Sequence, residues 1–201
     1  MTLYDLKPRF QALLRPLLRW LYQIDVTANQ VTLSALIAST IIGCLLIFIP
    51  EPKLFLILPF FLFIRMALNA IDGLLAREYK QQSKLGAILN EVGDVVSDSV
   101  LYLPFAFLPF AQSWLVVITV LLCVLSEFCG LLTQTIGATR RYDGPMGKSD
   151  RAFVFGVYGL SVAIFPQTLN WSSWIFASVA ILLVITCVNR CRKGLKQVAV
   201  N

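Results

Sequence analysis

The chain has 201 residues, of which 58% are hydrophobic and only 14% are charged. Soluble domains are typically about 45–50% apolar and about 25% charged, so this composition excludes an ordinary soluble enzyme and a disordered protein. The sequence contains no histidine, which excludes histidine-based nucleophilic catalysis and histidine-ligated zinc or haem. The formal net charge is +6. In a membrane protein such an excess is typical of cytoplasmic loops and lipid contact, and it does not indicate nucleic acid binding.

The cysteines are odd in number and form no CxxC pair, so we expect free thiols in apolar surroundings and neither a disulfide framework nor a metal site. They are Cys44, Cys123, Cys129, Cys187 and Cys191.

The first predicted element is a helix within residues 1–25. Its apolar run is too broken for a signal peptide. Leucines recur there at helical spacing with basic residues between them, which predicts an amphipathic helix on the cytoplasmic membrane interface. Pro8 and Pro16 predict a limit or a kink in this helix. A soluble helix that binds a partner is the alternative.

Six later segments approach the roughly 20 apolar residues that a membrane-spanning helix needs. They predict an all-α, polytopic membrane protein whose single domain covers residues 1–201, with a six-helix bundle over residues 31–188. The third segment is unusual because its first half is polar, and the fifth is short. The segments are Val31–Ile49, Leu54–Ile71, Ala87–Phe110, Trp114–Ile136, Ala152–Phe165 and Ser173–Val188.

The basic residues predict the orientation of these segments. Fifteen of the 17 lysines and arginines lie before the first segment, in alternate loops or in the tail, which puts them on one side of the membrane. The exceptions are Lys53, in the first opposite loop, and Arg65, inside the second segment. Positive loops stay in the cytoplasm, so both termini are predicted to be cytoplasmic.

Polar residues gather where the second segment ends and the third begins. Ionisable groups inside a membrane are costly and by default mark function. Within each segment they share one helix face. Because the two helices are antiparallel, we expect the two sets to face one another just under the cytoplasmic surface, with Arg65 near the level of Asp98. The residues are Arg65, Asn69 and Asp72 on one helix and Asn90, Asp94 and Asp98 on the other, with Glu91 beside them.

Carboxylate and amide oxygens of this kind suit a hard divalent cation such as Mg²⁺ or Mn²⁺. Small residues nearby leave room for a ligand or a backbone to approach closely. A rim of basic residues suits a diphosphate bridged by the metal. A polar seam that pairs internally, for instance Arg65 with Asp98, is the alternative. The rim residues are Arg77, Lys80, Lys84, Arg140, Arg141, Lys148 and Arg151.

The spacing of these residues resembles a family signature. The chain reads Asn69-x2-Asp72-Gly73-x2-Ala76-Arg77-x8-Gly86-x3-Asn90-x3-Asp94. This is similar to the pattern D-x2-D-G-x2-A-R-x8-G-x3-D-x3-D of the CDP-alcohol phosphatidyltransferase family, and in particular to small bacterial inner-membrane members. Because the eight-residue gap is included, the match is far more specific than a lone glycine motif.

The resemblance implies an enzyme of phospholipid biosynthesis. Such an enzyme binds CDP-diacylglycerol or another CDP-alcohol at the cytoplasmic side of the membrane. It transfers the substituted phosphate group to an acceptor alcohol and releases CMP. The resemblance also implies a Mg²⁺ or Mn²⁺ cofactor, membrane lipid around the chain and a homodimer. The acceptor stays open, because the sequence does not distinguish glycerol 3-phosphate, serine, inositol phosphate and other alcohols.

The family's site residues carry over by position. The metal ligands correspond to Asn69, Asp72, Asn90 and Asp94, and Asp94 is also the base for the acceptor hydroxyl. Two of the family's aspartates are therefore asparagines here, and Glu91 or Asp98 could compensate for the lost charge. In an alternative register Asp94 and Asp98 are the last two acids, and Asp98 becomes a catalytic candidate. The predicted CDP-binding residues are Gly73, Ala76, Arg77, Gly86, Lys148 and Arg151.

Two other functions remain open from the sequence. The asparagines favour a pseudoenzyme that keeps nucleotide binding and regulates or scaffolds lipid synthesis. The intramembrane charges are also found in transporters, but here they gather at one face of the membrane and do not line a path across it. Glu127 lies alone in the fourth segment, where it pairs with Arg65 or faces a dimer interface.

Overall fold

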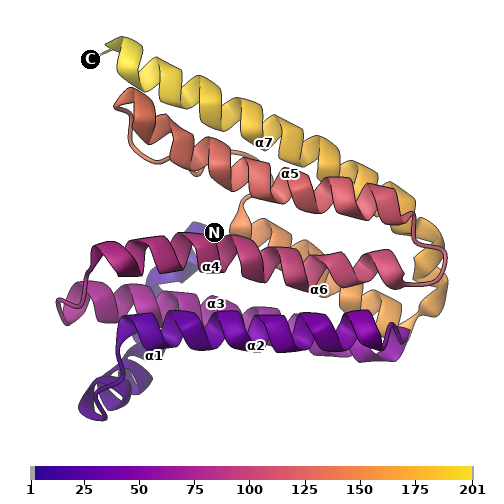
Figure 1. Ribbon diagram of the computed structural model, residues 1–201, viewed down its shortest axis with the longest axis horizontal. Helices are drawn as coiled ribbons and strands as arrows, with labels where there is room; N and C mark the ends of the chain where they lie inside the picture. The colour runs from indigo at the N-terminus through magenta and orange to yellow at the C-terminus, as the bar shows by residue number, and fades with distance from the viewer. Residues whose placement is uncertain (1–2, 201) are drawn as a thin grey trace.

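The computed structural model describes residues 3–200, with side chains for residues 10–199. Within this range the chain forms helices and no strand, as the sequence predicts. The described residues form seven α-helices, which Figure 1 labels, and short 3-10 turns lie at four of the connections. The α-helices are α1 (Leu3–Gln23), α2 (Ala28–Phe48), α3 (Ile57–Glu78), α4 (Lys84–Tyr102), α5 (Ser113–Leu132), α6 (Lys148–Ile164) and α7 (Ser172–Val200). The 3-10 turns are η1 (Pro52–Leu56), η2 (Leu103–Phe107), η3 (Thr133–Ile136) and η4 (Pro166–Trp171).

Helices α2 to α7 run side by side in a bundle. Helix α2 packs on α3 and α4, α3 packs on α6, and α5 packs along α7. The α5–α7 pair diverges from α4 toward the end of the bundle that carries the C-terminus (Figure 1). Polar side chains of several helices meet in this half of the molecule.

Four helical segments of the described chain are long and apolar enough to cross a membrane: Ala28–Phe48, Pro52–Glu78, Ser113–Ile136 and Pro166–Ala199. The sequence predicts six. The remaining two bundle helices fall short for physical reasons. Helix α4 carries acidic and amide residues on its inner face, and α6 has only 17 residues, with charges on three of its first four.

Three predicted boundaries differ from the structure. The third segment does not continue as one helix to Phe110, because Pro104 lacks an N–H and opens a 3-10 turn after Tyr102. The last helix extends past Val188, so the basic tail is helical. Helix α1 runs without a break from Leu3 to Gln23 despite its two prolines.

A buried aromatic core fills the half of the bundle opposite the polar one. The rings of Phe55 and Phe105 lie 4.9 Å apart, and those of Tyr102 and Phe155 lie 4.1 Å apart. Helix α2 approaches α4 at Gly43, where a β-carbon would clash with the backbone of Val100. This core fixes α2, α4 and α6 relative to one another and thereby holds the polar groups beyond it.

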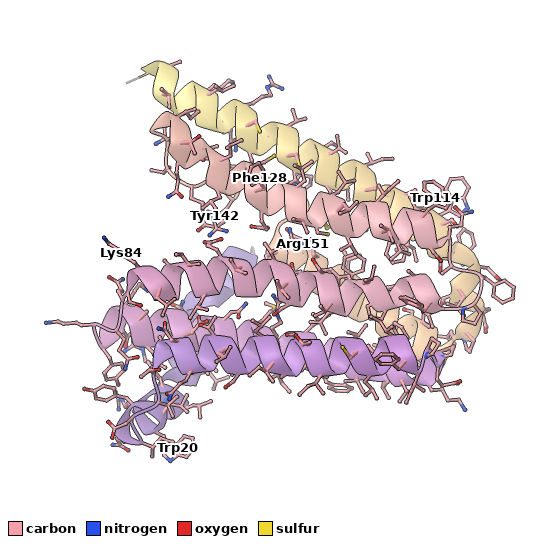
Figure 2. All side chains as sticks on the ribbon, in the orientation of Figure 1. Trp20, Lys84, Trp114, Phe128, Tyr142 and Arg151 are labelled. Carbon is pink, nitrogen blue, oxygen red and sulfur yellow. The ribbon has the colours of Figure 1, made fainter. Side chains whose placement is uncertain are left out.

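Helix α1 lies across the end of α2 and α3. Leu18 is fully buried against Ile71 and Leu75. On the opposite side, Leu13 and Trp20 are 76% and 54% exposed, and Figure 2 shows Trp20 directed away from the bundle. Helix α1 therefore carries one apolar stripe packed on the bundle and a second one directed outward.

Candidate active site

Helices α3 and α4 bring the predicted polar sets together at matching depths. Asn69 Nδ2 donates a hydrogen bond to Asp94 Oδ1 over 3.2 Å. One helical turn further on, Arg65 pairs with Asp98 over 2.5 Å. Arg65 Nη2 also donates to the backbone carbonyl of Asp94 over 3.0 Å. The antiparallel alignment inferred from the spacing is therefore confirmed.

Helix α2 supplies a neighbour that the metal-site prediction did not include. Thr32 Oγ1 donates to Asp72 Oδ2 over 2.7 Å and holds this carboxylate at the α2–α3 contact. Helix α2 begins with a capping box formed by Thr27 and Gln30. Such a box satisfies N–H groups that a helix start leaves unpaired. Thr32 follows this start by one turn, so the cap and the hydrogen bond to Asp72 both lie at the start of α2.

Gly86 is required by a close approach. Helix α4 starts at the Ser83 cap, whose hydroxyl accepts from the Gly86 N–H over 2.9 Å. A β-carbon at Gly86 would lie 2.6 Å from Asn29 Oδ1 of α2. The glycine of the motif therefore lets the starts of α2 and α4 pass each other. Gly73 faces another motif residue, since a β-carbon there would lie 3.3 Å from the Arg77 guanidinium.

The carboxylate of Asp94 is partly exposed and meets basic groups at one oxygen. Lys148, the first residue of α6, forms an ion pair with Asp94 Oδ1. Arg65 Nη2 lies 3.6 Å from the same oxygen, which also accepts from Asn69. The hydrogen bond and both ion pairs of the Asp94 side chain with described residues are formed at Oδ1. The second oxygen is therefore able to accept a proton or bind a cation.

The carboxylate of Asp98 has a different environment. The residue is only 3% exposed, and each oxygen meets an arginine. Oδ1 pairs with Arg65 and Oδ2 with Arg151, the latter over 2.8 Å. Figure 2 shows Arg151 between α4 and α5. An Asp98 held this way positions arginines, and it neither compensates for Asn90 nor offers a free oxygen to a substrate.

Glu127 of α5 lies at the centre of a second group of ion pairs. Arg151 Nη2 lies 2.9 Å from Oε1, Arg190 Nη1 lies 3.4 Å from Oε1, and Arg140 Nη2 lies 3.3 Å from Oε2. Arg140 also pairs with Glu91. The suggested partner of Glu127, Arg65, is thus occupied elsewhere, and three other arginines take its place.

The segment 137–147, between α5 and α6, is joined to α7 by an ion pair. Arg141 Nε and Lys193 Nζ donate to the two oxygens of Asp143 over 2.8 and 2.7 Å. Burial raises the pKa of Asp143, but the hydrogen bonds from Lys193 and Arg141 outweigh it, so the pKa lies below its usual value. A cavity of about 350 Å³ is lined by Arg140, Arg141, Tyr142 and Asp143. This cavity opens beside the arginines that surround Glu127.

The predicted CDP-binding residues have different neighbours in the structure. Ala76 packs against the apolar cluster around Leu18, and Lys148 contacts Asp94. Lys84 lies at the exposed start of α4 (Figure 2). Arg151, expected at the rim, is 1% exposed and engaged by two carboxylates. No feature of the sequence indicates this burial, because charge alone does not distinguish a rim from an interior.

The four predicted metal positions supply two carboxylates and two amides. Among the described residues no three acidic or cysteine side chains lie together in a way that could hold a metal ion. The oxygens of Asp72 and Asp94 with the amide oxygens of Asn69 and Asn90 still suit a hard cation, at lower negative charge than four carboxylates. The donor set therefore fits Mg²⁺ or Mn²⁺, with Lys148 already neutralising part of Asp94.

The sequence profile described as CDP-alcohol phosphatidyltransferase matches residues 25–187. The chain belongs to this family. It is 57% identical over 195 residues to the inner membrane protein YnbA of Escherichia coli, covering 97% of both chains. It is 28% identical to a phosphatidylinositol phosphate synthase of Mycobacterium marinum, over 90% of this chain and 79% of that enzyme.

Solved structures of the family share the fold. The phosphatidylinositol phosphate synthase PgsA1 of Mycobacterium tuberculosis, in complex with manganese and citrate, matches with a TM-score of 0.73 at 20% identity. That match covers 90% of this chain and 88% of that one. The same enzyme with CDP-DAG bound matches with a TM-score of 0.70 at 21% identity, over 89% and 92% of the two chains. These comparisons agree with the motif between Asn69 and Asp94 and with the all-helical bundle.

Proposed function

We propose that this protein transfers a substituted phosphate group from a CDP-alcohol, with CDP-diacylglycerol as the first candidate, to an acceptor alcohol in phospholipid synthesis. The observation that carries the proposal is the contact of Asn69 with Asp94 across α3 and α4, inside the family's motif. The solved relative with CDP-DAG bound supports the choice of donor.

The reaction is a displacement at phosphorus. Asp94 takes the proton of the acceptor hydroxyl on its uncontacted oxygen, and the hydroxyl oxygen attacks the phosphorus that carries the lipid alcohol. A new phosphorus–oxygen bond forms, the bond to the bridging oxygen of the diphosphate breaks, and CMP leaves with that electron pair. Lys148 lies beside Asp94, where its ammonium group stabilises the charge that develops on the phosphoryl oxygens.

We propose that Asp72 and Asp94, with the amide oxygens of Asn69 and Asn90, hold Mg²⁺ or Mn²⁺. A bound cation would neutralise the diphosphate and favour departure of CMP. The related PgsA1 structure with manganese and citrate supports this choice of metal. Thr32 fixes the Asp72 carboxylate, while Gly73, Ala76, Arg77 and Gly86 form the face that receives the nucleotide.

We propose six membrane crossings in the bacterial inner membrane, with both termini in the cytoplasm. The name of the E. coli relative supports this location. In the six-crossing arrangement α4 and α6 also cross the membrane, with polar residues toward the bundle and exposed apolar residues such as Val92 and Phe153 toward lipid. Helix α1 then lies on the cytoplasmic interface with Leu13, Leu17 and Trp20 in contact with lipid. As the family resemblance implies, we expect a homodimer.

A catalytically inactive member is the second candidate. It is favoured by Asn69 and Asn90, because each amide removes a negative charge from the metal site. Glu91 and Asp98 pair with arginines and do not restore that charge. Such a protein would bind the CDP-alcohol without releasing CMP.

CMP release distinguishes the two candidates. Purified protein with CDP-diacylglycerol, Mg²⁺ or Mn²⁺ and a panel of alcohols is expected to release CMP, and a chelator is expected to stop it. CDP-diacylglycerol binding with no CMP from any alcohol would favour the inactive member. A reporter fused at Asn201 should be active only in its cytoplasmic form, and one at Gln112 only in its periplasmic form.

A further inference from the structure

The arginines around Glu127 form a site of their own beside the proposed active site. Arg140 comes from segment 137–147, Arg151 from α6 and Arg190 from α7, and all three meet one carboxylate of α5. Arg151 and Arg190 are each 1% exposed. Planar guanidinium groups that converge in this way bind the oxygens of a carboxylate or of a phosphate. In this chain the protein's own Glu127 takes that place.

This cluster is joined to the proposed catalytic acid. Arg151 bridges Glu127 and Asp98, and Asp98 lies one helical turn from Asp94 on α4. Arg140 lines the cavity of about 350 Å³, so one member of the cluster is reached from outside. From Arg140 the ion pairs lead through Glu127 and Arg151 to Asp98, the neighbour of Asp94 on α4.

The charges of this region are already paired. Arg140 meets Glu91 and Glu127, Arg151 meets Asp98 and Glu127, and the cavity residue Arg141 meets Asp143. A phosphate group entering here would have to displace a buried carboxylate from its arginines or face Glu127 as a like charge, and both are unfavourable.

Uncharged oxygens face no such obstacle. The Nε atoms of Arg140 and Arg190 are buried and have no hydrogen-bond partner among the described residues. An N–H donor of this kind can bond to the hydroxyl of a neutral alcohol without any charge being displaced. The cluster therefore suits hydroxyl groups and disfavours phosphate.

We infer that Glu127 is a specificity-determining residue, a built-in counter-ion that closes the arginine cluster to phosphate and restricts the acceptor to uncharged alcohols. The part concerning the acceptor rests on the proposed transferase function. The part concerning phosphate binding does not, because it depends only on the charge of the cluster.

The first test measures binding of inorganic phosphate, by its effect on the melting temperature and by calorimetry in detergent. Glu127→Gln keeps the side-chain shape and removes the charge. It is expected to bind phosphate at least tenfold more tightly than the wild type. The control Glu51→Gln makes the same charge change at an exposed residue far from the cluster in sequence, and it is expected to behave like the wild type. Equal phosphate binding by all three proteins would overturn the inference.

The second test compares acceptors in the unmodified protein. CMP release with glycerol is expected to be at least tenfold faster than with glycerol 3-phosphate, and Glu127→Gln is expected to narrow that ratio. A purely structural role of Glu127 would lower both rates equally. A wild-type preference for glycerol 3-phosphate would overturn the inference, even if the variant does not fold. Absence of CMP with every acceptor would count against the proposed function, while the phosphate-binding test would still decide the role of Glu127.

Discussion

Asp94 and Asp98 lie one turn apart on α4 and have opposite environments. The side chain of Asp94 is 21% exposed and its contacts fall on one oxygen, whereas that of Asp98 is 5% exposed and each of its oxygens meets an arginine. The first carboxylate remains able to exchange protons with a ligand, and the second joins α3, α4 and α6. The polar residues of this bundle therefore have two kinds of environment, one open to a ligand at Asp94 and one closed by arginines at Asp98.

The largest expected effect comes from breaking the buried group of ion pairs. Arg151→Met should lower the free energy of unfolding by about 3–5 kcal/mol, because it leaves Asp98 and Glu127 short of a buried partner. The control Arg15→Met removes an exposed pair with Glu78 and should cost below about 1 kcal/mol. Thermal or denaturant unfolding in detergent measures both. Equal losses would show that burial does not distinguish the two pairs.

The next prediction concerns the proposed metal site around Asp94, where two asparagines can be changed to aspartates. The double change Asn69→Asp with Asn90→Asp should tighten Mn²⁺ binding by roughly tenfold or more, because each new carboxylate adds a ligand charge. An inactive member could gain CMP release, whereas an active variant should gain little because repulsion raises the pKa values of neighbouring carboxylates. Metal titration and CMP assays of wild type and variant separate these outcomes. Unchanged metal affinity would remove both asparagines from the metal site.

The smallest expected effect concerns Thr32, which joins α2 to the Asp72 carboxylate of the proposed metal site. Thr32→Val keeps the shape and removes the 2.7 Å hydrogen bond to Asp72, worth about 1 kcal/mol. CMP release should fall by a few fold, with the melting temperature nearly unchanged. Thr40→Val, at an exposed residue whose hydroxyl bonds only to its own helix, is the matched control. A loss as large as that of an Asp72 variant would assign Thr32 a direct role in binding.

The sequence predicted the parts of this molecule that depend on spacing along single helices. The similar depth of Arg65 and Asp98 followed from the alignment of two neighbouring helices joined by a short loop, and their ion pair is the one that the alternative of an internally paired polar seam named. The partners of Glu127 could not be predicted in this way. Arg140 approaches it from a loop and Arg190 from α7, and tertiary packing decides where both of these lie relative to α5. Thr32 lies at the start of the first predicted span, Val31–Ile49, and only the α2–α3 contact shows its partner, Asp72.

The burial of Arg151 escaped prediction for the same reason. A basic residue near the start of a membrane helix is usual on the cytoplasmic side, and the sequence alone places Arg151 and Lys148 together. In the structure they diverge, since Lys148 reaches the open carboxylate of Asp94 and Arg151 the closed one of Asp98. Because Lys148 and Arg151 are three residues apart on α6, nearly one helical turn, they contact α4 at positions that are also about one turn apart.

The most direct test of this division is a comparison of Asp94→Asn with Asp98→Asn for CMP release and melting temperature. We predict that Asp94→Asn lowers CMP release by about 10²- to 10⁴-fold, as loss of a general base does, and leaves the melting temperature nearly unchanged. Asp98→Asn should instead lower the melting temperature, because Arg65 and Arg151 lose a buried counter-ion. Full activity of Asp94→Asn together with a stable but inactive Asp98→Asn would contradict the account and identify Asp98 as the base.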